Sequence, residues 1–286
     1  MMESNASWNT LENNSSVKMK KIFSELYDYK DLIILFVKRD IKATYQQTIL
    51  GPMWLILQPI VTSLVLVFLG SIAQIKTPAG LSSFGFYLLG NSLWIFFSDA
   101  FNKTASTFTA NSSVFGKVYF PRLTVPVSVI ISNSYKLMFQ CLLFVVVYLY
   151  GIFILDIPCL ININALFLLP CFLMLSLLGL SFGLIISSLT TKYRDLTMLV
   201  SFGLQLLMFA SPVIYPLSQI PHDSKFYLLL ELNPITGWIE LAKKGFAPSS
   251  FFSWKLICYD VLFVLASLFV GIKVFHKVEK RFMDTV

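Results

Sequence analysis

Three polar residues stand out in an apolar stretch of this sequence because their types could bind or process a substrate. Asn133, Lys136 and Gln140 lie three and four residues apart within the otherwise apolar run 125–150. This spacing places them on one stripe of a helix. An ionisable group in such a run is costly unless it faces protein or water. Lys136 is therefore expected either to line a polar passage or to pair with a neighbour such as Asp99.

The usual sequence signals of an enzyme are absent. There is no GxxxxGK[ST] motif, and Gly116-Lys117 is followed by valine rather than a hydroxyl residue, so the chain lacks a P-loop for ATP. No HExxH motif and no close pair of carboxylates inside an apolar run is present. The sequence predicts a chain without a catalytic site, cofactor or metal of its own. If the protein moves something uphill, the energy comes from elsewhere.

The composition is that of an integral membrane protein. Of the 286 residues 56% are hydrophobic and 13% charged, and the mean hydropathy is +0.74. Crossing the hydrocarbon core takes about 20 apolar residues in a helix. Runs of about this length, without the alternation of barrel strands, predict an all-α protein with six transmembrane helices, at 53–74, 84–101, 125–150, 165–189, 196–214 and 255–273.

The basic residues predict the orientation. Most of the 22 Lys and Arg residues lie in the termini and in the connections on the same side as the termini. By the positive-inside rule, both termini are cytoplasmic. The net charge of +7 then reflects topology and attraction to anionic lipids rather than nucleic-acid binding.

The chain divides into three parts. Residues 1–24 are rich in Asn and Ser and are expected to form a disordered cytoplasmic tail. Residues 25–50 carry apolar side chains every fourth position and basic ones on the other face, which predicts an amphipathic helix at the membrane interface. A plain membrane anchor is the simpler alternative. The turn Gly51-Pro52 separates this helix from the six-helix domain, residues 51–286.

Two connections are longer than turns require. The cytoplasmic loop 102–122 is polar and ends in Phe120-Pro121-Arg122. The extracytoplasmic region 215–253 contains an apolar piece at 226–232 and an amphipathic piece at 235–246, both too short to span the membrane. They predict a pair of short helices that re-enter or rest on the outer leaflet, covered by protein at their ends.

Five blocks of the sequence together resemble a known family. They are FVKRDIKATYQQTILGPMWLILQPI at 36–60, KVYFPRLTVP at 117–126, TKYRDL at 191–196, SPVIYPLSQIP at 211–221 and LNPITGWIELAKKG at 232–245. In this order they are similar to membrane subunits of ATP-binding-cassette exporters for polysaccharides, above all O-antigen, capsule and teichoic-acid permeases. The resemblance covers roughly residues 25–280.

The resemblance implies a six-helix permease that forms a homodimer in the bacterial cytoplasmic (inner) membrane. Two copies of a separate ATPase subunit would bind ATP and Mg and drive the outward movement of an undecaprenyl-diphosphate-linked glycan, as in lipopolysaccharide biosynthesis. The helix 25–50 would guard the cytoplasmic opening, and the re-entrant pair would cap the exit.

Candidate site residues follow from this resemblance. Cations near the headgroup layer are expected to contact the substrate phosphates, namely Lys38, Arg39, Lys42 and Arg122. Arg122 has the alternative role of tying a helix start to lipid headgroups. The candidate sugar-facing aromatics, for which packing is the alternative role, are Tyr45, Trp54, Tyr87 and Trp94. The expected ATPase-coupling residues are Lys103, Asn111, Phe115 and Lys117.

Other functions remain open from the sequence. An ABC efflux permease for a drug or small lipid would share the six-helix plan. A membrane-embedded glycosyl or phosphoryl transferase would need an acidic or histidine cluster, and the sequence shows none. A self-standing channel would leave the cytoplasmic loop and the amphipathic helix without a task.

Overall fold

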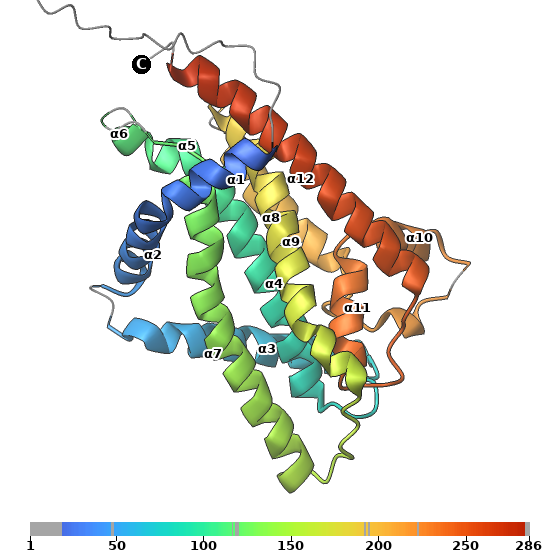
Figure 1. Ribbon diagram of the computed structural model, residues 1–286. Coiled ribbons are helices and arrows are strands. Elements are labelled where there is room, and N and C mark those ends of the chain that lie inside the picture. Colours follow the sequence, from blue (N-terminus) through green and yellow to red (C-terminus); the bar gives the residue numbers. More distant parts are fainter. Residues whose placement is uncertain are drawn as a thin grey trace, which may run out of the picture.

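The computed structural model of the protein describes residues 19–46, 49–115, 117, 120–191, 193, 195–221 and 223–283. All regular secondary structure within these residues is helical, as the sequence predicted (Figure 1). Of the predicted tail, residues 1–18 lie outside the described part of the chain. Its last residues belong to a helix, α1.

The long helices form a bundle, and the short ones lie at its ends (Figure 1). The long helices are α3 (Trp54–Ile72), α4 (Ser83–Ala105), α7 (Thr124–Ile154), α8 (Leu168–Thr190), α9 (Leu196–Phe209) and α12 (Trp254–Met283). The N-terminal helices are α1 (Met19–Asp28) and α2 (Lys30–Tyr45). The short connecting helices are α5 (Thr107–Ala110), α6 (Ser112–Phe115), α10 (Lys225–Leu232) and α11 (Thr236–Lys244).

Four helical segments in the described part of the chain are long and apolar enough to cross a membrane. They are Gly51–Ile72, Thr124–Ile154, Ile163–Thr190 and Trp254–Glu279. The predicted spans 84–101 and 196–214, which correspond to α4 and α9, are not among these four segments. Helix α4 has 23 residues but is rich in polar side chains. Helix α9 has 14 residues and ends at Phe209, shortly before Pro212, so it measures only about 21 Å.

Helix α4 lies at the centre of the bundle. It packs against α3, α7, α8, α9 and α11, and most of its side chains are buried. Asn91 in its middle is 2% exposed and donates a hydrogen bond to the Thr62 hydroxyl of α3 at 2.6 Å. A helix enclosed by protein needs no apolar surface for lipid, which explains why α4 tolerates polar residues.

Small residues let α8 approach α4 closely. Gly179 and Gly183 lie one turn apart on α8, in a GxxxG spacing, and both face α4. A Cβ atom on Gly179 would come within 2.8 Å of the Phe97 carbonyl oxygen, and one on Gly183 within 2.4 Å of the Thr104 Cβ. The backbones of α4 and α8 therefore meet with no room for a side chain between them.

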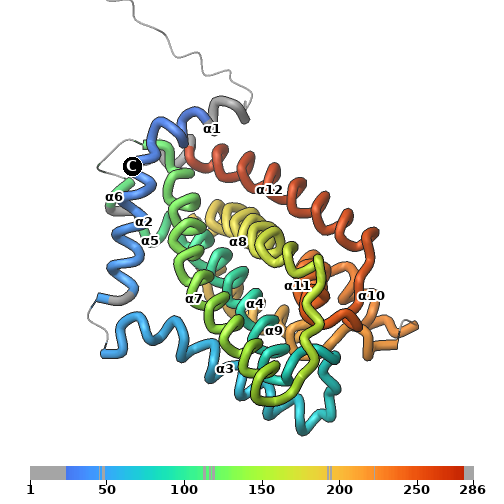
Figure 2. Tube along the Cα trace, turned by 60° about the horizontal axis from the view of Figure 1, so that its bottom comes forward, coloured from blue at the N-terminus to red at the C-terminus, as the bar shows by residue number. Residues whose placement is uncertain are grey.

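The predicted helix 25–50 is present as two helices. The chain breaks between α1 and α2 at Tyr29 (φ −97°, ψ 20°), and α2 ends at Tyr45 rather than at position 50. Its apolar residues Ile33 and Phe36 are buried against the bundle, and α2 lies beside α7 (Figure 2). Gly51 has a φ of +49°, a conformation that favours glycine, and it turns the chain into α3.

Two short helices, α10 and α11, lie where the sequence predicted short helical pieces. The residues of α11 from Thr236 to Lys243 are all buried, against α4, α8 and α12. Protein thus covers α11, whereas only Tyr227 and Leu230 of α10 are buried.

The α4–α8 contact predicts that alanine destabilises the protein at a glycine within the contact and not at a glycine outside it. Gly183→Ala should destabilise the protein by about 1–3 kcal/mol, because overpacking forces the two helices apart. Thermal unfolding of the purified protein measures this as a lower apparent melting temperature. The matched control is Gly203→Ala on α9, where an added Cβ meets nothing within 4 Å. Equal melting temperatures for both variants would contradict the proposed tight contact.

Candidate functional site

Polar side chains of α4 and α7 pair with each other inside the bundle. The Lys136 ammonium of α7 lies 2.5 Å from Oδ2 of Asp99 on α4, so of the alternatives left open for Lys136 the structure contains the pairing with Asp99. One end of the same stripe makes a second link, because Lys103 Nζ donates to Asn133 Oδ1 at 3.2 Å. The stripe thus faces α4 and joins two helices, rather than facing lipid.

The third member of the stripe lines a groove. The α2–α7 groove has a volume of about 150 Å³ and is lined by Thr44, Trp54, Leu55, Gln58, Pro59, Ile95, Lys136 and Gln140. Gln140 is 3% exposed, and its Oε1 has no hydrogen-bond partner in the described part of the chain. A smaller pocket next to the groove shares Thr44 and Lys136 and is also lined by Asp40 and Lys103.

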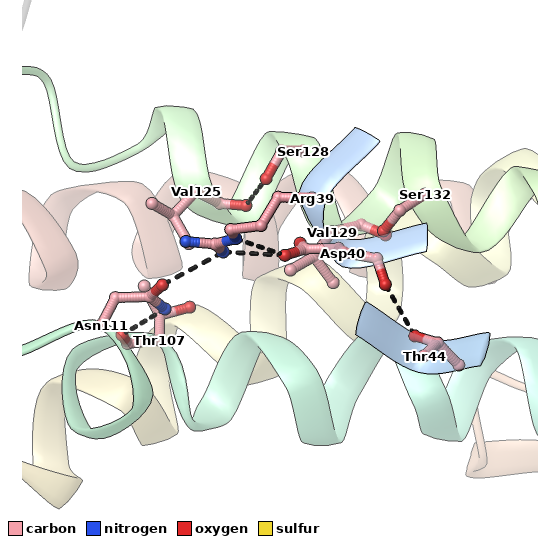
Figure 3. Close-up of polar contacts among 9 residues, drawn as sticks. All are labelled: Arg39, Asp40, Thr44, Thr107, Asn111, Val125, Ser128, Val129 and Ser132. Atoms are coloured by element: carbon pink, nitrogen blue, oxygen red, sulfur yellow. Dashed lines mark hydrogen bonds and ion pairs between the residues drawn. The ribbon is translucent and has the colours of Figure 1, made fainter. Parts of the chain in front are cut away.

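The basic residues of α2 are exposed but not equivalent. Lys38 and Lys42 reach the surface. Arg39 forms an ion pair with Asp40 at 2.8 Å, and its Nη2 donates to Asn111 Oδ1 at 3.3 Å. Figure 3 shows Arg39 reaching from α2 to Asn111 at the end of α5. Lys38 and Lys42 are therefore better placed than Arg39 to bind a ligand from outside.

Arg122 is enclosed by protein and is 5% exposed. Its guanidinium lies 5.3 Å from the ring centre of Phe115 and 6.0 Å from that of Phe108. Its backbone N–H donates to Glu279 Oε1 at 3.0 Å, and its Nη1 to the Glu279 carbonyl oxygen at 3.4 Å. Instead of reaching a headgroup, Arg122 joins the start of α7 to the end of α12 in this structure.

Arg122 belongs to a cluster that connects several helices at one end of the bundle. The aromatic cluster consists of Phe36, Phe108, Phe115, Phe120 and Phe275. Phe36 and Phe120 have ring centres 5.6 Å apart, and Phe108 stacks on Phe275 at 4.8 Å. The cluster thereby links α2, α5, α6 and α12 at the end of the bundle where α1 also lies (Figures 1 and 2).

The four aromatic candidates separate by burial. Tyr87 is 1% and Trp94 is 6% exposed, and both pack in the main core. Gly70 of α3 makes room for the Tyr87 hydroxyl. Trp54 is 48% exposed and lines the α2–α7 groove. The Tyr45 side chain lies outside the described part of the structure.

The four coupling candidates also occupy different places. Lys117 is exposed, and Asn111 is half-buried beside Arg39. Phe115 is buried in the aromatic cluster. Lys103 turns towards α7 through its bond to Asn133. Of the four, Asn111 and Lys117 therefore lie at the surface of the α5–α6 segment.

One buried ion pair was missed from the sequence. Lys243 of α11 is fully buried, 3.6 Å from Glu240 Oε1 and 3.9 Å from the ring centre of Phe86, and it donates to the Pro212 carbonyl oxygen. The spacing of Glu240 and Lys243 by one helical turn was the signal that could have found it. This pair fixes α11 to α4 and to the end of α9.

The Asp99–Lys136 pair predicts a double-mutant effect. Asp99→Asn or Lys136→Met alone should lower the apparent melting temperature by about 2–8 °C, because each leaves a half-buried charge unpaired at a cost of about 1–2 kcal/mol. The double variant should recover most of this loss. Additive losses in thermal unfolding of the purified protein would show that the two charges do not stabilise each other.

Comparisons with known proteins identify the family. The profile of the ABC-2 type transporter family matches residues 31–247. The O-antigen export system permease protein RfbA of Myxococcus xanthus is 30% identical over 230 residues, covering 77% of this chain and 81% of that protein. A protein of the same name from Klebsiella pneumoniae is 26% identical over 277 residues, covering 94% and 99%. The polysialic acid transport protein KpsM of Escherichia coli is 25% identical over 254 residues, covering 86% and 93%. The chain therefore belongs to the ABC-2 type transporter family, as a multi-pass membrane subunit that has no catalytic site of its own and relies on a separate ATPase.

Proposed function

We propose that this chain is the permease subunit of a transporter that exports a polysaccharide such as O-antigen, capsule or teichoic acid, linked to undecaprenyl diphosphate, across the bacterial cytoplasmic membrane. The observation that carries the proposal is the similarity to O-antigen and capsule export permeases along most of both chains. Two permease copies form a homodimer, and two copies of an ATPase subunit, which bind ATP and Mg, supply the energy.

The proposed topology has six spans, α3, α4, α7, α8, α9 and α12, with both termini in the cytoplasm. Two features support it. Helix α4 is surrounded by protein, so a span at this position needs no apolar face towards lipid. The segment α5–α6, the end of α12 and α1 lie at one end of the bundle (Figure 1), as expected if the region 102–122 is the cytoplasmic coupling surface. Region 215–253, with the covered helix α11, would then form the re-entrant cap on the other side.

Helix α2 is the proposed receiving surface for the substrate. Lys38 and Lys42 are exposed cations on a helix whose apolar side packs on the bundle. An exposed ammonium at the membrane interface attracts anionic headgroups, and a diphosphate is such an anion. Arg39 keeps α2 docked to the segment α5–α6 through Asn111, and Arg122 holds the helix ends that surround this contact. Asn111 and Lys117 are the proposed surface for the ATPase.

The function predicts a partner and a substrate response. The full chain should co-purify with the ATPase subunit of the same transporter, and the lipid-linked glycan of the same cell should raise ATP hydrolysis by the complex. Hydrolysis is measured in lipid nanodiscs with and without the glycan. A stable complex stimulated by a hydrophobic drug and not by the glycan would contradict polysaccharide export.

The receiving surface predicts a charge effect. Lys38→Glu combined with Lys42→Glu should strongly reduce the polymer exported to the cell surface, because the reversed charges repel the substrate phosphates. The amount of permease in the membrane should stay constant. The matched control is the same double reversal at Lys225 and Lys255, which are exposed at the other end of the bundle. Equal export by both double variants would remove α2 from phosphate recognition.

A further inference from the structure

The α2–α7 groove combines features that the roles above do not explain. It lies between the last turn of α2, the first turns of α3, and the facing sides of α4 and α7. Its volume is about 150 Å³. A cavity of about this size is known to hold a benzene molecule, which is a six-membered ring. The groove therefore has room for a group about the size of one small ring.

One polar group in the groove lacks a partner. Gln140 is almost fully buried, yet its side-chain oxygen makes no hydrogen bond within the described residues. Buried polar atoms in native proteins are nearly always hydrogen-bonded, so an unpaired amide that lines a groove points to a ligand. A hydroxyl group suits an amide in either orientation because it both donates and accepts.

The cation that lines the groove is already paired. Lys136 lines it, but its ammonium is held by Asp99 at 2.5 Å. The adjoining pocket is lined by Asp40, which is paired with Arg39, and by Lys103, whose ammonium donates to Asn133. An anion entering here would meet the Asp99 carboxylate together with the ammonium, so it gains little. The groove therefore favours an uncharged polar ligand over a phosphate.

An aromatic surface stands at the opening of the groove. Trp54 is 48% exposed, one helical turn before Gln58, whose amide is also exposed. Aromatic side chains with a few convergent polar groups are typical of small-molecule sites. The face of an indole ring can cover the apolar face of a sugar ring while the amides bind its hydroxyls.

We infer that the α2–α7 groove is a binding subsite for one neutral sugar ring, held by the amides of Gln140 and Gln58 and covered by Trp54. The inference rests on the proposed function and refines it. It separates the two chemical parts of the substrate, since the exposed lysines of α2 take the phosphates and the neutral groove takes a sugar.

The test is protection from chemical labelling in the full chain. The variant Ile95→Cys places a thiol in the groove, and the three cysteines that are not buried, Cys141, Cys159 and Cys258, are replaced by serine. The rate of maleimide labelling in nanodiscs is measured with dodecyl glycosides of glucose, galactose and N-acetylglucosamine, and with dodecyl phosphate. At a concentration equal to its dissociation constant, a glycoside should slow labelling about twofold. Dodecyl phosphate should leave the rate unchanged.

Variants assign the protection to the groove. Gln140→Leu should raise the dissociation constant of the glycoside, measured from its protection of the thiol, about fivefold. This is the effect of losing one hydrogen bond. Trp54→Leu changes an exposed residue and should weaken protection without disturbing the core. The control Ser134→Ala removes a hydroxyl from the same helix that is bonded to the Ile130 carbonyl oxygen, outside the groove, and should keep full protection.

The outcomes separate the subsite from the transport function. The inference is overturned if no glycoside slows labelling of the Ile95→Cys variant, if dodecyl phosphate protects equally, or if both groove variants retain full protection. Any of these results, together with glycan-stimulated ATP hydrolysis, would leave the exporter intact and remove the sugar subsite. Glycoside protection in a chain that binds no ATPase would support the subsite and contradict the exporter.

Discussion

Polar groups in an apolar protein must find partners within it. Helix α4 carries several of these groups and places them against neighbouring helices. Asp99 and Lys103 leave α4 towards α7, and Asn91 leaves it towards α3. These contacts are possible because five other helices enclose α4. The glycines of α8 close the remaining side by allowing backbone contact. The arrangement of the bundle around α4 thus determines where polar side chains can be carried at membrane depth.

The periodicity of the sequence predicted the helices well but predicted their neighbours poorly. Continuous apolar runs identified the all-helical fold, and the pairing of the lone lysine Lys136 with Asp99 was one of the alternatives that the sequence left open. Arg122 is buried although it was expected at the membrane surface, and Tyr87 and Trp94 pack in the core, which was their alternative role. A residue type does not reveal which helices pack around it. The break at Tyr29 was missed because the four-residue repeat continues across it. The GxxxG spacing of α8 is visible in the sequence and could have predicted a close helix contact.

Pairing with carboxylates determines which cations of the candidate site remain available to a ligand. The same basic residue types have different uses in one region: Lys136 and Arg39 are neutralised by adjacent carboxylates, whereas Lys38 and Lys42 are exposed. Sequence spacing alone treats these cations alike. The distances divide the region into an exposed positive surface and a neutral groove, which is the division that a substrate with a charged end and an uncharged polymer would require.

In the proposed function, helix α2 connects the substrate-receiving surface to the α5–α6 segment that is proposed to meet the ATPase. Helix α2 carries the exposed lysines on one side, and Phe36 on its other side packs in the aromatic cluster with Phe108 and Phe115 of the α5–α6 segment. Arg39 adds a polar contact to Asn111 of the same segment. A displacement of α5 and α6 by a bound ATPase would therefore act on α2 through packed rings and a hydrogen bond, a contiguous physical route. Since the groove includes Thr44 of α2, such a displacement would also change the groove, linking energy input to the position of the substrate.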